Sequence, residues 1–175
     1  MPTRPIRRVG IVLSGACGRS LWPARMPWGT IAVMETFAVV PFTDTHADGV
    51  AAVCAELGWP TYSDPDVARR GCGAPGVSTS VALDADGVVV GFAQLFGDGI
   101  VQGFLAQLGV RSDWRHRGVA TALVEAASRD AGVQRVDLLT DDAQGFHASF
   151  AHRAKDGYRI YPGLDPEPYR RLSDR

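Results

Sequence analysis

The residues whose types and spacing carry the clearest chemistry are Arg115-His116-Arg117-Gly118-Val119-Ala120, at the start of an alanine-rich stretch. Gly118 adopts unusual dihedral angles cheaply and lets a ligand approach the backbone, and the small Ala120 leaves that approach open. If a helix begins near Gly118, its first N–H groups have no intrahelical partners, and the helix dipole adds partial positive charge. The segment therefore predicts a binding site for a phosphate-bearing ligand, with Arg115 and Arg117 supplying further charge.

This segment does not identify the ligand by itself. A P-loop would end in Gly-Lys-Ser or Gly-Lys-Thr, and a dinucleotide-binding fingerprint would have three spaced glycines directly after a strand. Residues 115–120 match neither pattern. An ordinary helix start with surface arginines has the same composition, so the surrounding elements must decide between the two interpretations.

The elements around the segment are predicted from apolar periodicity and turn residues, which indicate an α/β chain. The expected strands are 36–40, 78–83, 88–96, 100–110, 135–140 and 158–161. The expected helices are 43–57, a short one at 66–70, 118–131, and a helical or turn-like stretch at 142–155. A strand-helix-strand unit over 100–140 implies a parallel pair of strands and therefore a mixed sheet.

The same periodicity predicts which side chains face the core. In the first helix the buried face is Ala47, Val50, Ala51, Cys54 and Leu57. In the helix over 118–131 it is Ala120, Leu123, Val124 and Ala127. In the strand over 100–110 one face is expected to hold Ile100, Phe104, Ala106, Leu108 and Val110, with Gln102 as a polar exception.

Leu108-Gly109-Val110, followed after four connector residues by residues 115–120, resembles the acetyl-CoA motif of the GNAT acetyltransferase superfamily. That motif is Q/R-x-x-G-x-G/A after a strand that ends in aliphatic-x-Val. The resemblance extends over 36–161 and includes the element order and the Gly157-Tyr158-Arg159 ending. It implies a GNAT-like mixed central sheet flanked by helices, in a single domain, with acetyl-CoA as cosubstrate and no metal. Arg111 stands where proline is common in the family.

The resemblance also implies roles for the motif. The backbone amides of residues 117–121 would hold the pyrophosphate, and residues 108–110 would pair with the pantetheine arm like an added strand. A backbone N–H in 108–110 would polarise the thioester carbonyl. Direct attack by an amine would then give an amide and free CoA. The implied cofactor-binding residues are Leu108, Gly109, Val110, Arg115, His116, Arg117, Gly118, Val119, Ala120 and Thr121.

The proton donor is the first departure from the family. Many members protonate the leaving thiolate with a tyrosine on the last helix, before a Gly-Phe or Gly-Tyr pair. In this sequence His147, after Phe146, is the best match to that tyrosine, and histidine donates a proton near neutral pH. His152 is the match at a shorter spacing, and solvent is the alternative acid.

The general base is the second departure. Some members have a glutamate on the strand before the motif, where this sequence has Gln107, which cannot serve as a base. Asp98 is a candidate, but Gly97-Asp98-Gly99 is also ordinary turn chemistry, and we favour the turn. A chain of water molecules to solvent would serve as well.

The expected activity is transfer of an acetyl group from acetyl-CoA to a primary amine of a small molecule or a protein. A non-catalytic acetyl-CoA-binding regulatory or sensor module is the alternative, because the usual tyrosine and glutamate are absent. A domain for a different phosphate ligand is a third possibility. Fold resemblance alone does not choose among them.

Several segments could contact the acceptor. Residues 61–77 form a candidate substrate-side loop. Trp59, Tyr62 and Trp114 could line an acceptor pocket, although packing is the commoner role of aromatic residues. Arg69-Arg70 is interpreted as a solvated helix end rather than a clamp for an acidic substrate.

Composition argues against several classes of protein. The 175-residue chain has 18 Lys and Arg, 19 Asp and Glu and a net charge of −1, which does not predict nucleic-acid binding. No apolar run approaches the roughly 18 residues that span a bilayer. Cys17, Cys54 and Cys72 match no zinc pattern or disulfide framework, so a reducing, cytoplasmic setting fits best. Cys54 is expected in the core. A homodimer is the commonest oligomer of soluble proteins, but no residue specifies one.

Residues 1–33 differ from the acetyltransferase-like region at 34–175. They are rich in arginine and proline and contain no acidic residue. Their apolar stretch at 9–13 is shorter than the core of a signal peptide. Two explanations are open: Met34 is the natural start and the preceding segment an upstream translation, or the segment is a disordered arm.

Overall fold

In the computed structural model of the chain, residues 36–163 are described, and the predicted extension at 1–33 lies outside them. The sheet has five strands in the spatial order β1-β2-β3-β4-β5. Neighbouring strands are antiparallel except β4 and β5, which are parallel. The strands are β1 (Ala38–Pro41), β2 (Val77–Leu83), β3 (Val89–Gly97), β4 (Gln102–Val110) and β5 (Arg135–Leu138). The predicted mixed sheet is therefore confirmed.

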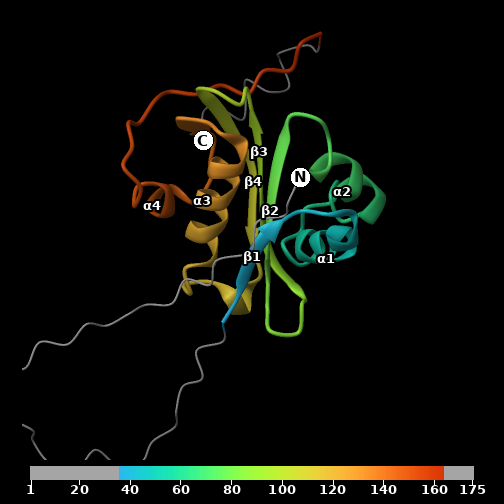
Figure 1. The fold of residues 1–175 in the computed structure, drawn as a ribbon. Coiled ribbons are helices and arrows are strands. Elements are labelled where there is room, and N and C mark those ends of the chain that lie inside the picture. Colours follow the sequence, from blue (N-terminus) through green and yellow to red (C-terminus); the bar gives the residue numbers. More distant parts are fainter. Residues whose placement is uncertain (1–35, 164–175) are drawn as a thin grey trace, which may run out of the picture. The chain divides into compact units, whose positions relative to one another are not determined.

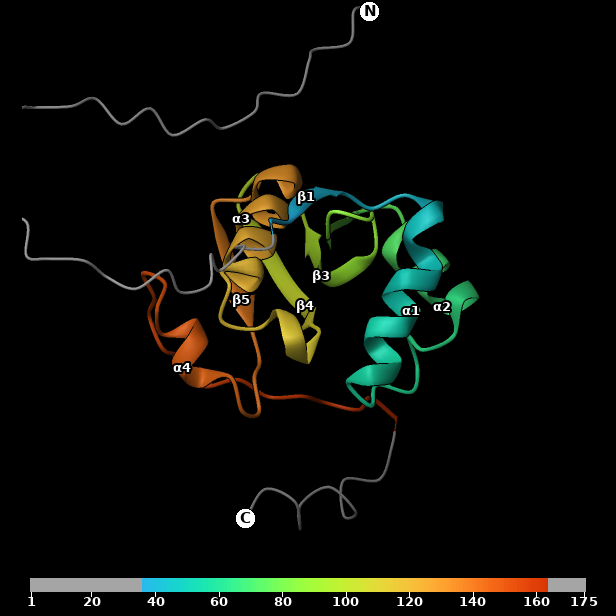
Figure 2. The ribbon, with the colours of Figure 1, turned by 90° about the horizontal axis from the view of Figure 1, so that it is seen from below.

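Helices cover both faces of this sheet (Figures 1 and 2). One face packs against α3 (Val119–Ala131), and α4 (Gln144–His147) lies on the same side. The other face packs against α1 (Ala47–Glu56) and α2 (Pro65–Cys72). Two short 3-10 helices, η1 (Asp44–His46) and η2 (Ser112–Trp114), precede α1 and α3. In the described residues no helix is both long and apolar enough to cross a membrane.

The core is divided by the sheet into two apolar clusters. Leu123 of α3 is fully buried in the first, and Phe92 of β3 in the second, beneath α1 and α2. The predicted buried face of α1 is confirmed for Ala47, Val50, Ala51 and Cys54, whereas Leu57 follows the helix and is partly buried. Burial raises the pKa of the Cys54 thiol to about 12 and that of Cys72 to about 11, so both thiols stay protonated.

A β-bulge changes the expected face of β4. Gln107 pairs with Gln94, but the next pair is Leu105 with Leu95, so Ala106 is an extra residue on β4. Because one extra residue reverses the alternation of side chains, Leu105 lies with Leu108 and Val110 in the α3 cluster. The prediction that Phe104 shares their face was wrong, and its side chain is 39% exposed. Ile100, predicted on the same face, is also exposed.

The C-terminal part of the described region also differs from expectation. The helical stretch predicted at 142–155 contains only the four-residue α4, and the strand predicted at 158–161 is irregular. Tyr158 is 85% exposed and Ile160 is 77% exposed. A strand is stabilised by a paired edge and a buried face, and residues 158–161 have no buried face here, so their β-type composition is not sufficient.

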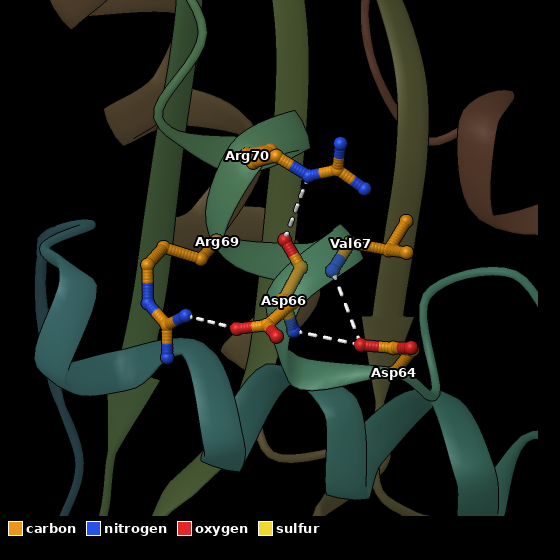
Figure 3. Close-up of polar contacts among 5 residues, drawn as sticks. All are labelled: Asp64, Asp66, Val67, Arg69 and Arg70. Atoms are coloured by element: carbon orange, nitrogen blue, oxygen red, sulfur yellow. Dashed lines mark hydrogen bonds and ion pairs between the residues drawn. The ribbon is translucent and has the colours of Figure 1, made fainter.

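The start of α2 shows how a side chain fixes a helix boundary. Asp64 is the N-cap, and its Oδ1 accepts hydrogen bonds from the N–H groups of Asp66 at 2.8 Å and Val67 at 3.3 Å (Figure 3). Arg69 pairs with the Asp66 carboxylate, and the Arg70 Nε donates to the Asp66 carbonyl at 3.4 Å. Both arginines therefore make local helix contacts, in agreement with the predicted helix end.

We expect Asp64→Ala to destabilise the protein by about 1 kcal/mol, because two N–H groups of α2 lose their acceptor. The measurement is the urea midpoint at constant m-value. Asp156→Ala is the matched control, since Asp156 is exposed in an irregular segment. Equal midpoints for the two variants would contradict the proposed capping.

Candidate functional site

The predicted phosphate-binding segment forms the junction between β4 and α3. Gly118 is the N-cap of α3 and has φ +82°, and His116 has φ +60°. His116 and Gly118 therefore both have left-handed backbone dihedral angles, and together they turn the chain from the end of η2 into the helix. A Cβ at Gly118 would meet no atom within 4 Å, so its dihedral angle rather than crowding requires glycine there.

The N-terminus of α3 is open as an anion site. The Ala122 N–H donates to the Gly118 carbonyl at 3.1 Å, which is the first helical bond. The N–H groups of Val119, Ala120 and Thr121 precede that bond, and the N-cap offers them no side-chain acceptor. No acidic side chain lies in the first turn to neutralise the helix dipole. This end of the helix can therefore bind a negatively charged group.

The arginines beside this helix end are exposed but anchored. The Arg117 guanidinium lies 4.9 Å from the centre of the Trp114 ring, a cation–π contact. The Arg115 Nε donates to the Val110 carbonyl at 3.4 Å. Trp114 is buried in the α3 cluster, so packing, not a wall of an acceptor pocket, is its role.

Glu56, at the end of α1, holds the connector before the anion site. Its Oε1 accepts hydrogen bonds from the Ser112 N–H at 2.8 Å and the Ser112 hydroxyl at 2.9 Å. Its Oε2 lies 3.2 Å from the Arg111 Nε. The hydrogen bonds from Ser112 are the largest cause of a lowered pKa for Glu56. Sequence reasoning missed this residue, because no motif links positions 56 residues apart.

The end of β4 has an unpaired edge that faces away from β3. The pairing with β5 runs only from Gln102 to Leu105, and no other described strand continues it. The Arg111 N–H donates to the Val90 carbonyl of β3 at 2.9 Å. Since antiparallel strands alternate the direction of their backbone groups, Leu108 and Val110 direct theirs to the open edge, where the Val110 carbonyl accepts from Arg115. An extended ligand could therefore pair with β4 as an added strand.

The predicted proton donors lie outside this junction. His147 ends α4 and is partly buried, with its ring 5.0 Å from that of Phe146 in an edge-on contact. Burial lowers the pKa of His147 below its ordinary value of 6.5. His152 is exposed, and its Nδ1 lies 3.0 Å from the Phe150 carbonyl.

Asp98 stabilises the turn before β4, which is the interpretation that the sequence favoured over a general base. Its Oδ1 accepts hydrogen bonds from the N–H groups of Ile100, Val101 and Gln102 at 2.8–3.0 Å. These bonds lower the pKa of Asp98, which makes it a poor base at neutral pH. A shallow hollow of about 430 Å³ lies at this end of the sheet, away from the anion site. Its lining is Gly76, Phe96, Gly97, Asp98, Gln102, Gly103 and Phe104.

Trp59 and Tyr62, which were predicted as possible linings of an acceptor pocket, lie on the other face of the sheet, beneath α1 and α2. Trp59 packs against Phe92 with ring centres 6.3 Å apart. The Tyr62 hydroxyl lies 3.3 Å from the Gln94 Nε2. The candidate loop at 61–77 contains the eight-residue helix α2. In the part of the chain that the structure describes, no group of three or more His, Cys, Asp or Glu side chains could hold a metal ion.

Comparison with known proteins gives the same family as the motif. Residues 76–151 match the family model of the acetyltransferase (GNAT) domain. No curated protein matches the sequence. Of the solved structures that match, one is the aminoglycoside N-acetyltransferase AAC(6')-Iy in complex with the bisubstrate analogue CoA-S-monomethyl-acetylneamine. It is 21% identical, the match covers 74% of this chain and 99% of that one, and the TM-score is 0.61.

Two further solved structures have the same fold. An acetyltransferase of Trypanosoma brucei is 19% identical, with 72% of this chain and 99% of that chain covered and a TM-score of 0.56. The ribosomal-protein-alanine N-acetyltransferase of Brucella melitensis biovar Abortus 2308 is 17% identical, with 72% and 98% covered and a TM-score of 0.58. At these identities the likeness shows a shared fold and leaves the substrate open.

We expect Glu56→Gln to destabilise the protein at pH 7, because the charged acceptor of the Ser112 hydrogen bonds is lost. The folded-state pKa of Glu56 lies below its ordinary value of 4.5, so its contribution is present above pH 4.5 and disappears as the pH falls through the folded value. Denaturant unfolding between pH 3 and 7 measures this. Glu125→Gln, at an exposed position on α3, is the control. A difference from wild type that is the same at every pH would contradict the role of the charge.

Proposed function

We propose that this chain, which carries a GNAT acetyltransferase domain, transfers the acetyl group of acetyl-CoA directly to a primary amine of a small molecule or a protein. The observation that carries the proposal is the pairing of two features at one junction. An uncapped helix N-terminus begins at Gly118, and the unpaired edge of β4 ends at Val110. The first suits a pyrophosphate and the second suits an extended arm that bears amide groups.

In this proposal the N–H groups of Val119, Ala120 and Thr121 bind the pyrophosphate. Arg115, His116 and Arg117 border it, and Glu56 keeps the connector in place. The pantetheine arm extends from Val110 toward Ala106 and hydrogen-bonds to the backbone of residues 108–110. Solved neighbours of the same fold in complex with CoA support a CoA-type ligand.

The reaction needs no covalent enzyme intermediate. The amine attacks the acetyl carbonyl, and a backbone N–H of residues 108–110 stabilises the negative charge that develops on the oxygen. The C–S bond then breaks, CoA leaves as a thiolate that takes up a proton, and the amine loses one. Cys54 and Cys72 are unsuited as nucleophiles, because both are buried and have raised pKa values.

The anion site can be tested with two glycines that have similar dihedral angles. Gly118 has φ +82°, and Gly99, in the turn before β4, has φ +75°. A Cβ on either would meet no atom within 4 Å. Gly118→Val and Gly99→Val therefore carry similar backbone strain. We expect only Gly118→Val to weaken acetyl-CoA binding, by about tenfold or more, in calorimetric titration. Equal affinities would overturn the assignment of the site.

The activity itself is tested by release of the CoA thiol from acetyl-CoA over a panel of primary amines that includes neamine and peptides with a free N-terminus. We expect release with at least one of them. Binding of acetyl-CoA without release would favour the regulatory module. No thermal stabilisation by acetyl-CoA at concentrations far above typical affinities would favour a different phosphate ligand.

His147 is the proposed donor of the proton to the leaving thiolate. Because burial lowers the pKa of His147 below 6.5, its protonated form is abundant only on the acid side of that value. We expect kcat of His147→Phe to fall below that of wild type at acid pH, and the two profiles to converge as the pH rises above 7. His152→Phe is the control. A constant ratio from pH 5 to 8 would remove His147 from the mechanism.

A further inference from the structure

An exposed apolar surface lies on the sheet beyond the cover of α1 and α2. Phe96 of β3 and Phe104 of β4 are paired across the two strands, and their side chains are 44% and 39% exposed. Both belong to the face that α1 and α2 cover elsewhere. No extra residue separates Gln94 from Phe96 on β3, and the Gln94 amide donates to the Gly71 carbonyl of α2 at 2.9 Å. The two rings line the hollow of about 430 Å³, so a ligand can reach them from solvent.

This hollow continues the line of the proposed cosubstrate. A ligand arm on the open edge of β4 meets the pairing of Leu105 with β5, which ends that edge. The arm therefore stops at Ala106 with its thioester. Phe104 is two residues further along the strand and Gln102 is four, which is about 7 and 13 Å at 3.3 Å per residue. The hollow therefore begins where the reacting group of the cosubstrate ends.

The open approach to this thioester is from the side of Phe104. On the opposite side Leu105 is 5% exposed and packs in the α3 cluster, so α3 closes that approach. Because side chains alternate along a strand, Phe104 faces away from α3 and into the hollow. An acceptor whose amine lies at the thioester therefore places the rest of its body over Phe104 and Phe96.

The charge around the hollow suits a cation. Among the described residues of its lining Asp98 has the charged side chain, and three N–H groups hold its carboxylate in the ionised form. The next charges, Arg135 and Asp137 of β5, are bridged by the Gln102 amide at 3.1 and 3.2 Å, and they offset each other. A free alkylamine is a cation at neutral pH before it reacts. An anionic group on the acceptor would be repelled by Asp98.

Resting on the proposed function, we propose that this hollow binds the body of the acceptor, and that the acceptor is a primary amine with an apolar body that carries no anionic group. The two phenylalanine rings remove an alkyl or aryl body from water, which strengthens binding in proportion to the apolar area buried. The body extends about 7–13 Å from the reacting nitrogen. A shorter amine leaves the hollow empty, and an amino acid brings a carboxylate close to Asp98.

The test measures kcat/KM for a series of primary alkylamines from ethylamine to octylamine. For wild type we expect a rise of about two- to fourfold for each CH₂ group beyond butylamine, since those groups reach the rings. We expect Phe104→Ala and Phe96→Ala to flatten this rise. The control is Val88→Ala, because Val88 is 47% exposed and lies outside the lining of the hollow. Damage to folding would instead lower kcat/KM by the same factor at every chain length.

The charge is tested with hexylamine and 6-aminohexanoate, which differ by a carboxylate on the body. We expect wild type to prefer hexylamine, and Asp98→Asn to reduce this preference by about two- to threefold at low salt. Asparagine keeps an Oδ1 acceptor for the N–H groups of the turn. Asp86→Asn, in the exposed turn before β3, is the control. A preference that Asp98→Asn leaves unchanged would overturn the selection by charge.

A wild-type series without a rise, or a rise that both phenylalanine variants keep, overturns the inference. A kept rise together with loss of a dimer in sedimentation would assign the rings to a contact between copies of the chain. If wild type releases no CoA with any amine, the backbone amides of Gly97 and Gly103 in the lining are followed by NMR as the protein is titrated with hexylamine. Shifts there and none at Gly87 would support the hollow while the proposed catalysis fails. No shift would overturn the hollow as well.

Discussion

The extra residue in β4 at Ala106 is the constraint on which the rest of this structure depends. A strand that bordered both β3 and β5 along its whole length would have no free backbone groups at the end that precedes α3. The bulge bends the strand and coincides with the end of its pairing to β5. It also keeps Leu105, Leu108 and Val110 together in the α3 cluster. One inserted residue therefore separates a structural half of β4 from a half available to a ligand, without loss of core packing.

The second half of β4 leads into a junction that is fixed from several directions. Glu56 binds the connector from α1, the Trp114 ring is buried beneath the Arg117 guanidinium, and left-handed residues set the entry into α3. A helix end that is left uncapped would ordinarily fray, since its first N–H groups lack partners. Here the loop is held by contacts outside the helix, so the open N–H groups remain available. Preorganised donors of this kind bind an anion at little entropic cost.

Local features of the sequence were sufficient for much of this description. Gly118 and its flanking arginines predicted the anion site, and helical and strand periodicity predicted β1 to β5 and α1 to α3, because short-range pattern and burial agree in these elements. The face of β4 was not predictable, since the bulge at Ala106 depends on the register with β3. The role of Glu56 and the hollow between Gly76 and Phe104 depend on contacts distant in sequence. At residues 158–161 β-type composition suggested a strand, and composition alone does not supply a partner edge.

The division of the core by the sheet bears on how the protein can diverge. Leu123 and its neighbours pack against one face, and Phe92, Cys54 and Trp59 pack against the other, with the sheet backbone between them. Substitutions in clusters that share no side-chain contact have nearly additive effects on stability. Changes in the cluster beneath α1 and α2 that spare Glu56 and the packing against Gly109 would therefore leave the junction at Gly118 intact. The cluster on one face of the sheet can then change during evolution to suit a new ligand, while the cluster on the other face is kept.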